Sequence, residues 1–111
     1  MSYTIEYYSE QVQSEILDLP KTLLARFLHF SRRMETYGPN LGMPHTRHMA
    51  GGLLELRLKG QEGIARVLYC ALVKNRIVVL HCFIKKTDKT PPKELAIGRR
   101  RLKEVTSHVD S

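Results

Sequence analysis

The chain has 111 residues, a net charge of +7 and 42% hydrophobic residues, a composition typical of one globular domain. No apolar run is long enough to span a bilayer, and residues 1–10 do not resemble a signal peptide. We therefore expect a single cytoplasmic domain over residues 1–111 that makes no contact with a membrane.

The charge is unevenly distributed along the chain. Residues 1–46 contain four basic and five acidic side chains, whereas residues 47–111 contain fourteen basic and six acidic ones. All of the positive excess therefore lies in the second part of the chain. This distribution favours a polyanionic partner, above all a nucleic acid.

The cysteines and histidines do not suggest a metal site or a cofactor. Cys70 and Cys82 lie inside apolar stretches, which is typical of buried thiols in a reducing compartment. The five histidines are scattered, and only His45 and His48 are close in sequence. A zinc site needs about four ligands at close spacing, so we predict no metal and no cofactor.

The first part of the chain predicts a strand followed by two helices. Residues 3–8 are rich in aromatic and β-branched side chains, which favours a strand. Ser9 is a suitable cap for a first helix, and Pro20 both ends that helix and suits the first turn of a second. The second helix has apolar residues at helical spacing, and Gly38-Pro39 ends it. We expect the two helices to form an antiparallel hairpin.

The second part predicts three strands and a basic helix after a loop over residues 38–52. In residues 54–59, leucines alternate with Glu, Arg and Lys, which indicates a strand with one buried and one polar face. Residues 64–73 and 77–84 are apolar runs, the second expected at the centre of the sheet. Thr90-Pro91 suits the start of the last helix. The predicted fold is α+β, in the order β-α-α-β-β-β-α, with the helical hairpin packed on a mostly antiparallel four-stranded sheet.

The polar residues of these strands predict a basic surface. Glu55, Arg57 and Lys59 point to one face of the sheet by the period of two, and that face is open if the leucines meet the helices. Arg66 is the one charged residue in its strand, and a charge there needs solvent, a partner or a ligand. The candidate catalytic residues are Arg57, Arg66, Lys85, Lys86 and Glu55. The candidate RNA-binding residues are Lys59, Thr87, Lys89, Arg99, Arg100 and Arg101.

These side chains suit cleavage of RNA. A base must activate a ribose 2′-hydroxyl, cations must stabilise charge on the phosphate, and an acid must protonate the leaving 5′-oxygen. A lysine crowded by other cations can transfer a proton, and arginine can clamp a phosphate. Glu55 is the one carboxylate on the proposed face and hence an alternative base.

Structural roles for the same residues remain open. Arg66 can pair with Glu55, and Arg57 and Lys59 can form a solvated face. The basic run 99–103 can be a solvated helix face. His81 suits a hydrogen-bonded core position, and His45 and His48 are expected to be neither ligands nor catalysts.

Three segments of the chain read G-G-L-L-E-L-R-L-K over 51–59, G-I-A-R-V-L-Y over 63–69, and I-V-V-L-H-C-F-I-K-K-T-D-K-T-P over 77–91. These segments resemble the RelE/ParE toxin superfamily, in particular its phage-derived, HigB-like branch. The resemblance implies a toxin of a type II toxin–antitoxin pair. It further implies a ribosome-dependent mRNA endonuclease that needs no metal and uses the 2′-hydroxyl of the RNA.

The resemblance also implies residue roles and partners. The basic positions of the family match Arg57, Arg66 and Lys86, with Lys85 beside it. Glu55 replaces a lysine of RelE-like members, and Pro92 stands where those members have a tyrosine. The implied partners are the ribosome, mRNA and a cognate antitoxin, usually with a helix-turn-helix DNA-binding domain. Two alternatives remain: a ParE-like toxin that binds a protein such as DNA gyrase, and a non-catalytic nucleic-acid-binding protein.

Overall fold

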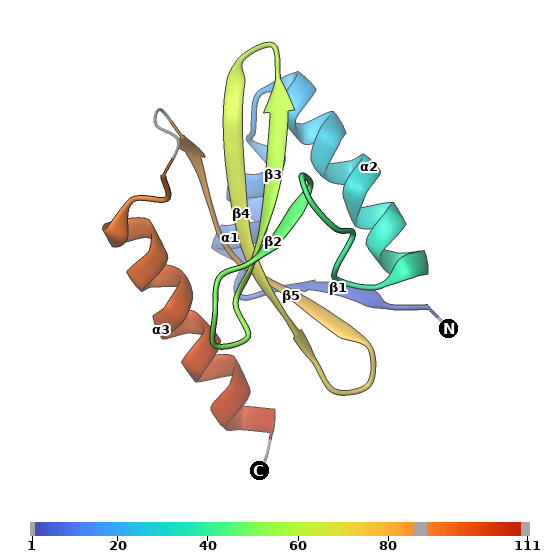
Figure 1. The fold of residues 1–111 in the computed structure, drawn as a ribbon, viewed down its shortest axis with the longest axis vertical. Helices are drawn as coiled ribbons and strands as arrows, with labels where there is room; N and C mark the ends of the chain where they lie inside the picture. Colours follow the sequence, from blue (N-terminus) through green and yellow to red (C-terminus); the bar gives the residue numbers. More distant parts are fainter. Residues whose placement is uncertain (1, 86–88, 110–111) are drawn as a thin grey trace.

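The structure, a computed structural model, describes residues 2–85 and 89–109. Eight helices and strands follow one another along these residues (Figure 1). They are β1 (Thr4–Tyr7), α1 (Glu10–Leu17), α2 (Lys21–Tyr37), β2 (Thr46–His48), β3 (Leu54–Gly60), β4 (Gly63–Leu72), β5 (Arg76–Lys85) and α3 (Pro92–Val109). None of the described helices is long and apolar enough to span a bilayer.

The sheet has five strands, in the order β1-β5-β4-β3-β2. β1 is parallel to β5, and the other neighbours are antiparallel. The predicted α+β class is confirmed, but the prediction of four strands is wrong. β2 lies inside the predicted loop 38–52, and its three residues are too few to show the period of a strand. The middle strand is β4 rather than the predicted β5, which lies between β4 and β1.

Helices α1 and α2 cover one face of the sheet with a largely apolar core. The leucines of β3 point into this core, as their alternation predicts. The helical stripe of α2 meets them, again as predicted. The core residues contributed by α2 and β3 are Leu23, Phe27, Phe30, Met34, Leu54, Leu56 and Leu58.

Helix α3 covers part of the opposite face, which the sequence predicted to be open and merely edged by this helix. In Figure 1, α3 and α2 flank the strands from opposite sides. Leu102 of α3 packs with Leu68, Leu80 and Phe83 of the sheet. Gly98 allows this close packing, because a Cβ atom at that position would lie 2.6 Å from a methyl group of Leu68.

A register shift between Leu68 and Tyr69 adjusts which side chains of β5 face α3. Leu68 pairs with His81, whereas Tyr69 pairs with Val79, so β5 contains an extra residue, Leu80, at this point. Such a bulge re-aims the side chains of the longer strand. Leu80 packs in the α3-side core, and His81 bonds to a residue of α3.

Candidate functional site

The charged residues of the sheet lie in neighbouring rows that run across β3, β4 and β5. Arg57 is directly opposite Arg66, and Lys59 is opposite Ile64, which in turn pairs with Lys85. Residues paired in this way point to the same face of a sheet. The sheet therefore brings together Arg57, Arg66, Lys59 and Lys85, as the sequence predicted, although these residues are far apart along the chain.

Glu55 does not lie on an open surface. Its side chain is 1% exposed, and it accepts hydrogen bonds from three other side chains. Arg66 of β4 and Arg47 of β2, the latter at 3.0 Å, donate to Oε1, and the Thr90 hydroxyl donates to Oε2 at 2.5 Å. The expectation that Glu55 lies on an open face is therefore wrong, and its role as an alternative base stays a prediction. Glu55 instead orients Arg66 and holds the segment that leads into α3.

Arg57 and Arg66 form a pair of cations at a small hollow. The hollow has a volume of about 100 Å³ and is lined by Met43, Pro44, His45, Arg47, Glu55, Arg57 and Arg66. Within the described part of the chain, the Nε atoms of Arg57 and Arg66 are buried and have no hydrogen-bond partner. Buried donors of this kind are costly unless a ligand can bind them. Two adjacent guanidinium groups suit the oxygens of a phosphate.

Lys85 is the last residue of β5, and it is buried with a 7% exposed fraction. Lys86 and Thr87, which were predicted as catalytic and RNA-binding residues, lie outside the described residues. Lys59 and Lys89 are exposed, as expected of residues that contact a polyanion.

The basic run of α3 divides into structural and exposed residues. Arg101 donates to the Leu80 carbonyl oxygen at 2.8 Å and lies 4.7 Å from the centre of the Tyr8 ring, so it holds α3 against the sheet. Arg99 donates to the carbonyl oxygens of Met49 and Ala50 and so joins α3 to the segment before β3. Arg100 is exposed. It lies 4.0 Å from the Glu104 carboxylate, and its role in RNA binding stays a prediction.

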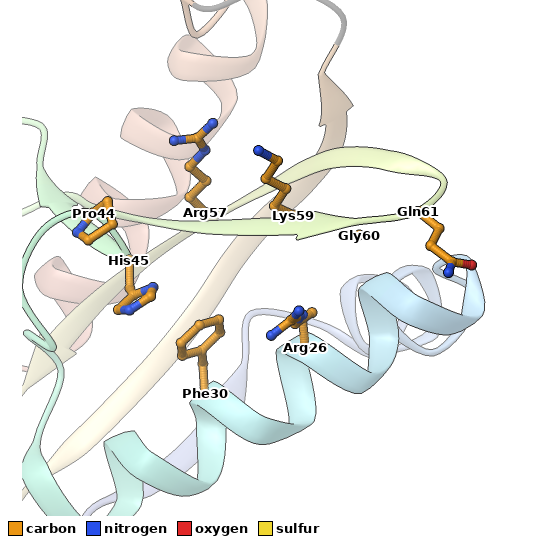
Figure 2. Close-up of a pocket in the computed structure, with 8 residues that line it drawn as sticks. All are labelled: Arg26, Phe30, Pro44, His45, Arg57, Lys59, Gly60 and Gln61. Atoms are coloured by element: carbon orange, nitrogen blue, oxygen red, sulfur yellow. The ribbon is translucent and has the colours of Figure 1, made fainter.

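His45 lies at the hollow, although its sequence context gave no reason to assign it a function. Its ring contacts Phe30 of α2, with 4.8 Å between the ring centres, and it lines both the small hollow and a larger one (Figure 2). The fold brings the two rings together from positions 15 residues apart. No local pattern in the sequence could have identified this pair.

His81 of β5 contacts a side chain of α3. Its Nε2 atom is 3.0 Å from the Glu94 carboxylate of α3, and its ring stacks on Phe83. This geometry confirms the interpretation of His81 as a hydrogen-bonded histidine of the packed interior. Within residues 2–85 and 89–109, no three His, Cys, Asp or Glu side chains are grouped in a way that could hold a metal ion.

Comparison with known proteins identifies the family. The model of a family described as "Phage derived protein Gp49-like" matches residues 14–103. The chain belongs to this Gp49-like family. The family is one of RelE/HigB-type toxins, so the resemblance in the three strand segments is confirmed and the chain is a toxin of the RelE superfamily. A search of curated proteins finds no match.

A solved structure supports the same assignment through the fold. The chain is similar to one in the crystal structure of the archaeal RelE–RelB complex from Pyrococcus horikoshii OT3, with a TM-score of 0.51 and 25% sequence identity. The match covers 76% of this chain and 96% of that chain.

Proposed function

We propose that this Gp49-like toxin is an endoribonuclease that cuts mRNA on the ribosome without a metal ion. The observation that supports the proposal is the pair of cross-strand arginines, whose buried Nε atoms have no hydrogen-bond partner in the described part of the chain. Each guanidinium is a planar fork of N–H donors that can donate two parallel hydrogen bonds to a phosphate. Arg57 and Arg66 would therefore hold the scissile phosphate and stabilise the charge that develops on it.

The proposed reaction uses the RNA's own nucleophile. The ribose 2′-oxygen attacks the adjacent phosphorus, the bond to the 5′-oxygen breaks, and the products are a 2′,3′-cyclic phosphate and a 5′-hydroxyl. A base takes the proton of the 2′-hydroxyl, and an acid gives a proton to the leaving 5′-oxygen. We assign these proton transfers to Lys85, the last residue of β5, and to Lys86, which follows it in the sequence. Glu55 acts as a positioning residue, because its oxygens already accept from Arg66, Arg47 and Thr90.

The proposal is tested by mapping RNA ends. Purified toxin is added to ribosomes programmed with a defined mRNA, and the new 3′ ends are examined for cyclic phosphate. We expect cleavage by the intact protein and a loss of at least about a hundred-fold for Arg57→Ala, which removes a charge-stabilising donor. The matched control is Arg76→Ala, which removes an arginine at the other end of the sheet, paired with Glu6. Uncut mRNA with the intact protein, or equal cleavage by Arg57→Ala, would contradict the proposal.

We also infer that a cognate antitoxin binds the toxin. The similar archaeal RelE chain was crystallised with RelB, which supports a partner of this type. The charge of the second part of the chain favours an acidic contact segment. Expression alone should arrest growth, and co-expression with the adjacent reading frame should restore it. If co-expression restores growth but the two proteins do not form a complex in a pull-down experiment, the inference is contradicted.

A further inference from the structure

A second and larger hollow lies beside the arginine pair. Its volume is about 490 Å³, and Figure 2 shows it between α2, the segment at residues 44–45 and the end of β3. Arg57 and Lys59 rise from one side of β3, whereas Phe30, Arg26 and His45 lie on the other side. The hollow therefore extends around the outer edge of the sheet. Its lining residues are Arg26, Phe30, Pro44, His45, Arg57, Lys59, Gly60 and Gln61.

The edge of the sheet is open at this place because β2 is short. β2 pairs only with Leu54–Leu56, and the last contact of this edge is a hydrogen bond of 2.9 Å from the Arg57 amide to the His45 carbonyl oxygen. In the described residues, no strand continues along Leu58–Gly60 on this side. A chain that crosses the polar face can thus pass over the edge of β3 into the larger hollow.

The aromatic part of the hollow is held firmly in place. The rings of Phe30 and His45 are 4.8 Å apart with an angle of 40° between their planes. Phe30 is anchored in the α2-side core, and the backbone of His45 is bonded at both its amide and its carbonyl. The His45 side chain is half-buried, so part of its ring remains accessible. A preorganised ring loses little conformational entropy when a planar ligand stacks on it.

The charged part of the hollow is wholly cationic. Arg26, Arg57 and Lys59 line it, and none of its eight lining residues is acidic. An aromatic surface beside cations is the arrangement that single-stranded nucleic acids require, since every base has a π-face and every nucleotide carries a phosphate. A free apolar ligand would not need three cations, and an inorganic anion would not need the rings.

The two hollows share Pro44, His45 and Arg57, so they are parts of one continuous surface. We propose that the larger hollow binds the nucleotide next to the scissile phosphate, with its base stacked on His45 beside Phe30 and its phosphate between Arg26 and Lys59. This assignment rests on the proposed function, because that function places RNA at the arginine pair. It makes His45 and Phe30 the residues that recognise a base.

The proposal is tested with a short RNA that cannot be cut. The probe is a fluorescent RNA trinucleotide with 2′-O-methyl groups, and its affinity for the purified toxin is measured by fluorescence anisotropy. We expect His45→Ala to weaken binding about ten-fold, in line with the loss of one base–aromatic stack. The matched control is His48→Ala, three residues away and exposed on β2, which should bind as the intact protein does. Arg26→Ala should also weaken binding, whereas Arg32→Ala, which removes an exposed arginine on another side of α2, should not.

An abasic probe separates stacking from charge. A set of trinucleotides is prepared, each of which lacks the base at a different position. Intact toxin should bind one of these probes less tightly than the complete trinucleotide, and His45→Ala should bind that probe and the complete trinucleotide equally well. Phe30→Leu, which keeps an apolar side chain at a buried position, should give a smaller loss than His45→Ala. Equal binding of every probe by the intact toxin and His45→Ala would overturn the inference.

The outcomes also distinguish this inference from the proposed function. If the stacking pattern is found but ribosome-bound mRNA stays uncut, the proposed function fails and the nucleotide site stands. If mRNA is cut at unchanged positions and rates by His45→Ala, the nucleotide site is refuted and the proposed function stands. Circular dichroism and the melting temperature of each variant show whether it is folded.

Discussion

The two faces of the sheet are built from alternate residues of the same strands, yet their chemistry is opposite. On β3, Leu56 points to α1 and α2, whereas its neighbour Glu55 points to the other face. Both side chains are at most 2% exposed. The α2-side face is an apolar core, and the α3-side face combines an apolar patch with a row of charges.

This contrast indicates that the two faces of the sheet have different roles. Burial of leucines stabilises the fold at little cost, whereas burial of Glu55 and Arg66 removes two charges from water and adds little or nothing to net stability. An apolar pair of the same volume would serve folding equally well. The charges are therefore best explained by what they position, which is a guanidinium pair at a hollow large enough for a phosphate.

The largest change in stability is expected from breaking the buried ion pair between Glu55 and Arg66. Glu55→Leu leaves Arg66 buried without its carboxylate and should lower the free energy of unfolding by about 3–5 kcal/mol. The double variant Glu55→Leu, Arg66→Met should recover most of this loss while remaining unable to cut RNA. Urea denaturation followed by circular dichroism measures both. A loss below about 1 kcal/mol in the single variant would show that the pair behaves like an exposed one.

A smaller effect is expected on the apolar face. Leu56→Ala leaves a cavity in the α2-side core and should cost about 2–4 kcal/mol in the same denaturation experiment. RNA cleavage per folded molecule should fall far less than in Arg57→Ala, because no residue of the arginine hollow belongs to this core and Phe30 is the one lining residue of the larger hollow that does. The conservative variant Leu56→Met should cost less than about 1.5 kcal/mol. A fall in cleavage without a change in folded fraction would show that the two faces are coupled.

The contrast also explains what could be predicted from the sequence. The alternation of leucines in β3 and the apolar stripe of α2 are local signals, and both elements and their shared core were predicted from them. β2 was missed because three residues show no period. The bulge opposite Leu68 and Tyr69 was missed because residues 77–80 of β5 form a continuous apolar run, so no alternation marks the extra residue, Leu80.

The site could be predicted only in part, because a local sequence pattern does not reveal contacts between residues that are distant along the chain. The strand positions of Arg57 and Arg66 follow from the period of two and from hairpin pairing. The burial of Glu55 depends on partners 8, 11 and 35 residues away, which a local pattern does not reveal. The contact of His45 with Phe30 likewise depends on how the segment before β2 packs on α2. Resemblance to the family identified the basic positions but not these two contacts.

The alkylation rates of the two cysteines measure how easily each face of the sheet opens. Cys70 lies in the α3-side core, and Cys82 packs against the α2-side core. Burial raises the pKa of each thiol to about 11, so alkylation of the folded protein should be slow at pH 7 and should rise steadily toward pH 11. Leu102→Ala should speed alkylation of Cys70 roughly ten-fold by loosening α3. Mass spectrometry measures the rates, each in a background where the other cysteine is serine. Equal acceleration of both thiols would show that α3 does not open separately from the rest of the fold.

The smallest change in stability is expected from breaking an exposed ion pair of the same sheet. Glu6 of β1 accepts two hydrogen bonds from Arg76 of β5, at 2.8 and 2.9 Å, and more than a third of each side chain is exposed. The Arg76 hydrogen bonds lower the pKa of Glu6 from its ordinary value of 4.5. A carboxyl with a lowered pKa stabilises the fold above its unfolded pKa, and this contribution is lost as the pH falls through the lower, folded value. Glu6→Gln should therefore lower the urea midpoint slightly at pH 7. The difference should begin to shrink near pH 4.5, vanish once the pH lies below the lowered pKa of Glu6, and also shrink in high salt. An effect as large as that of Glu55→Leu would refute the view that charge on this sheet is costly to disturb only where it is buried.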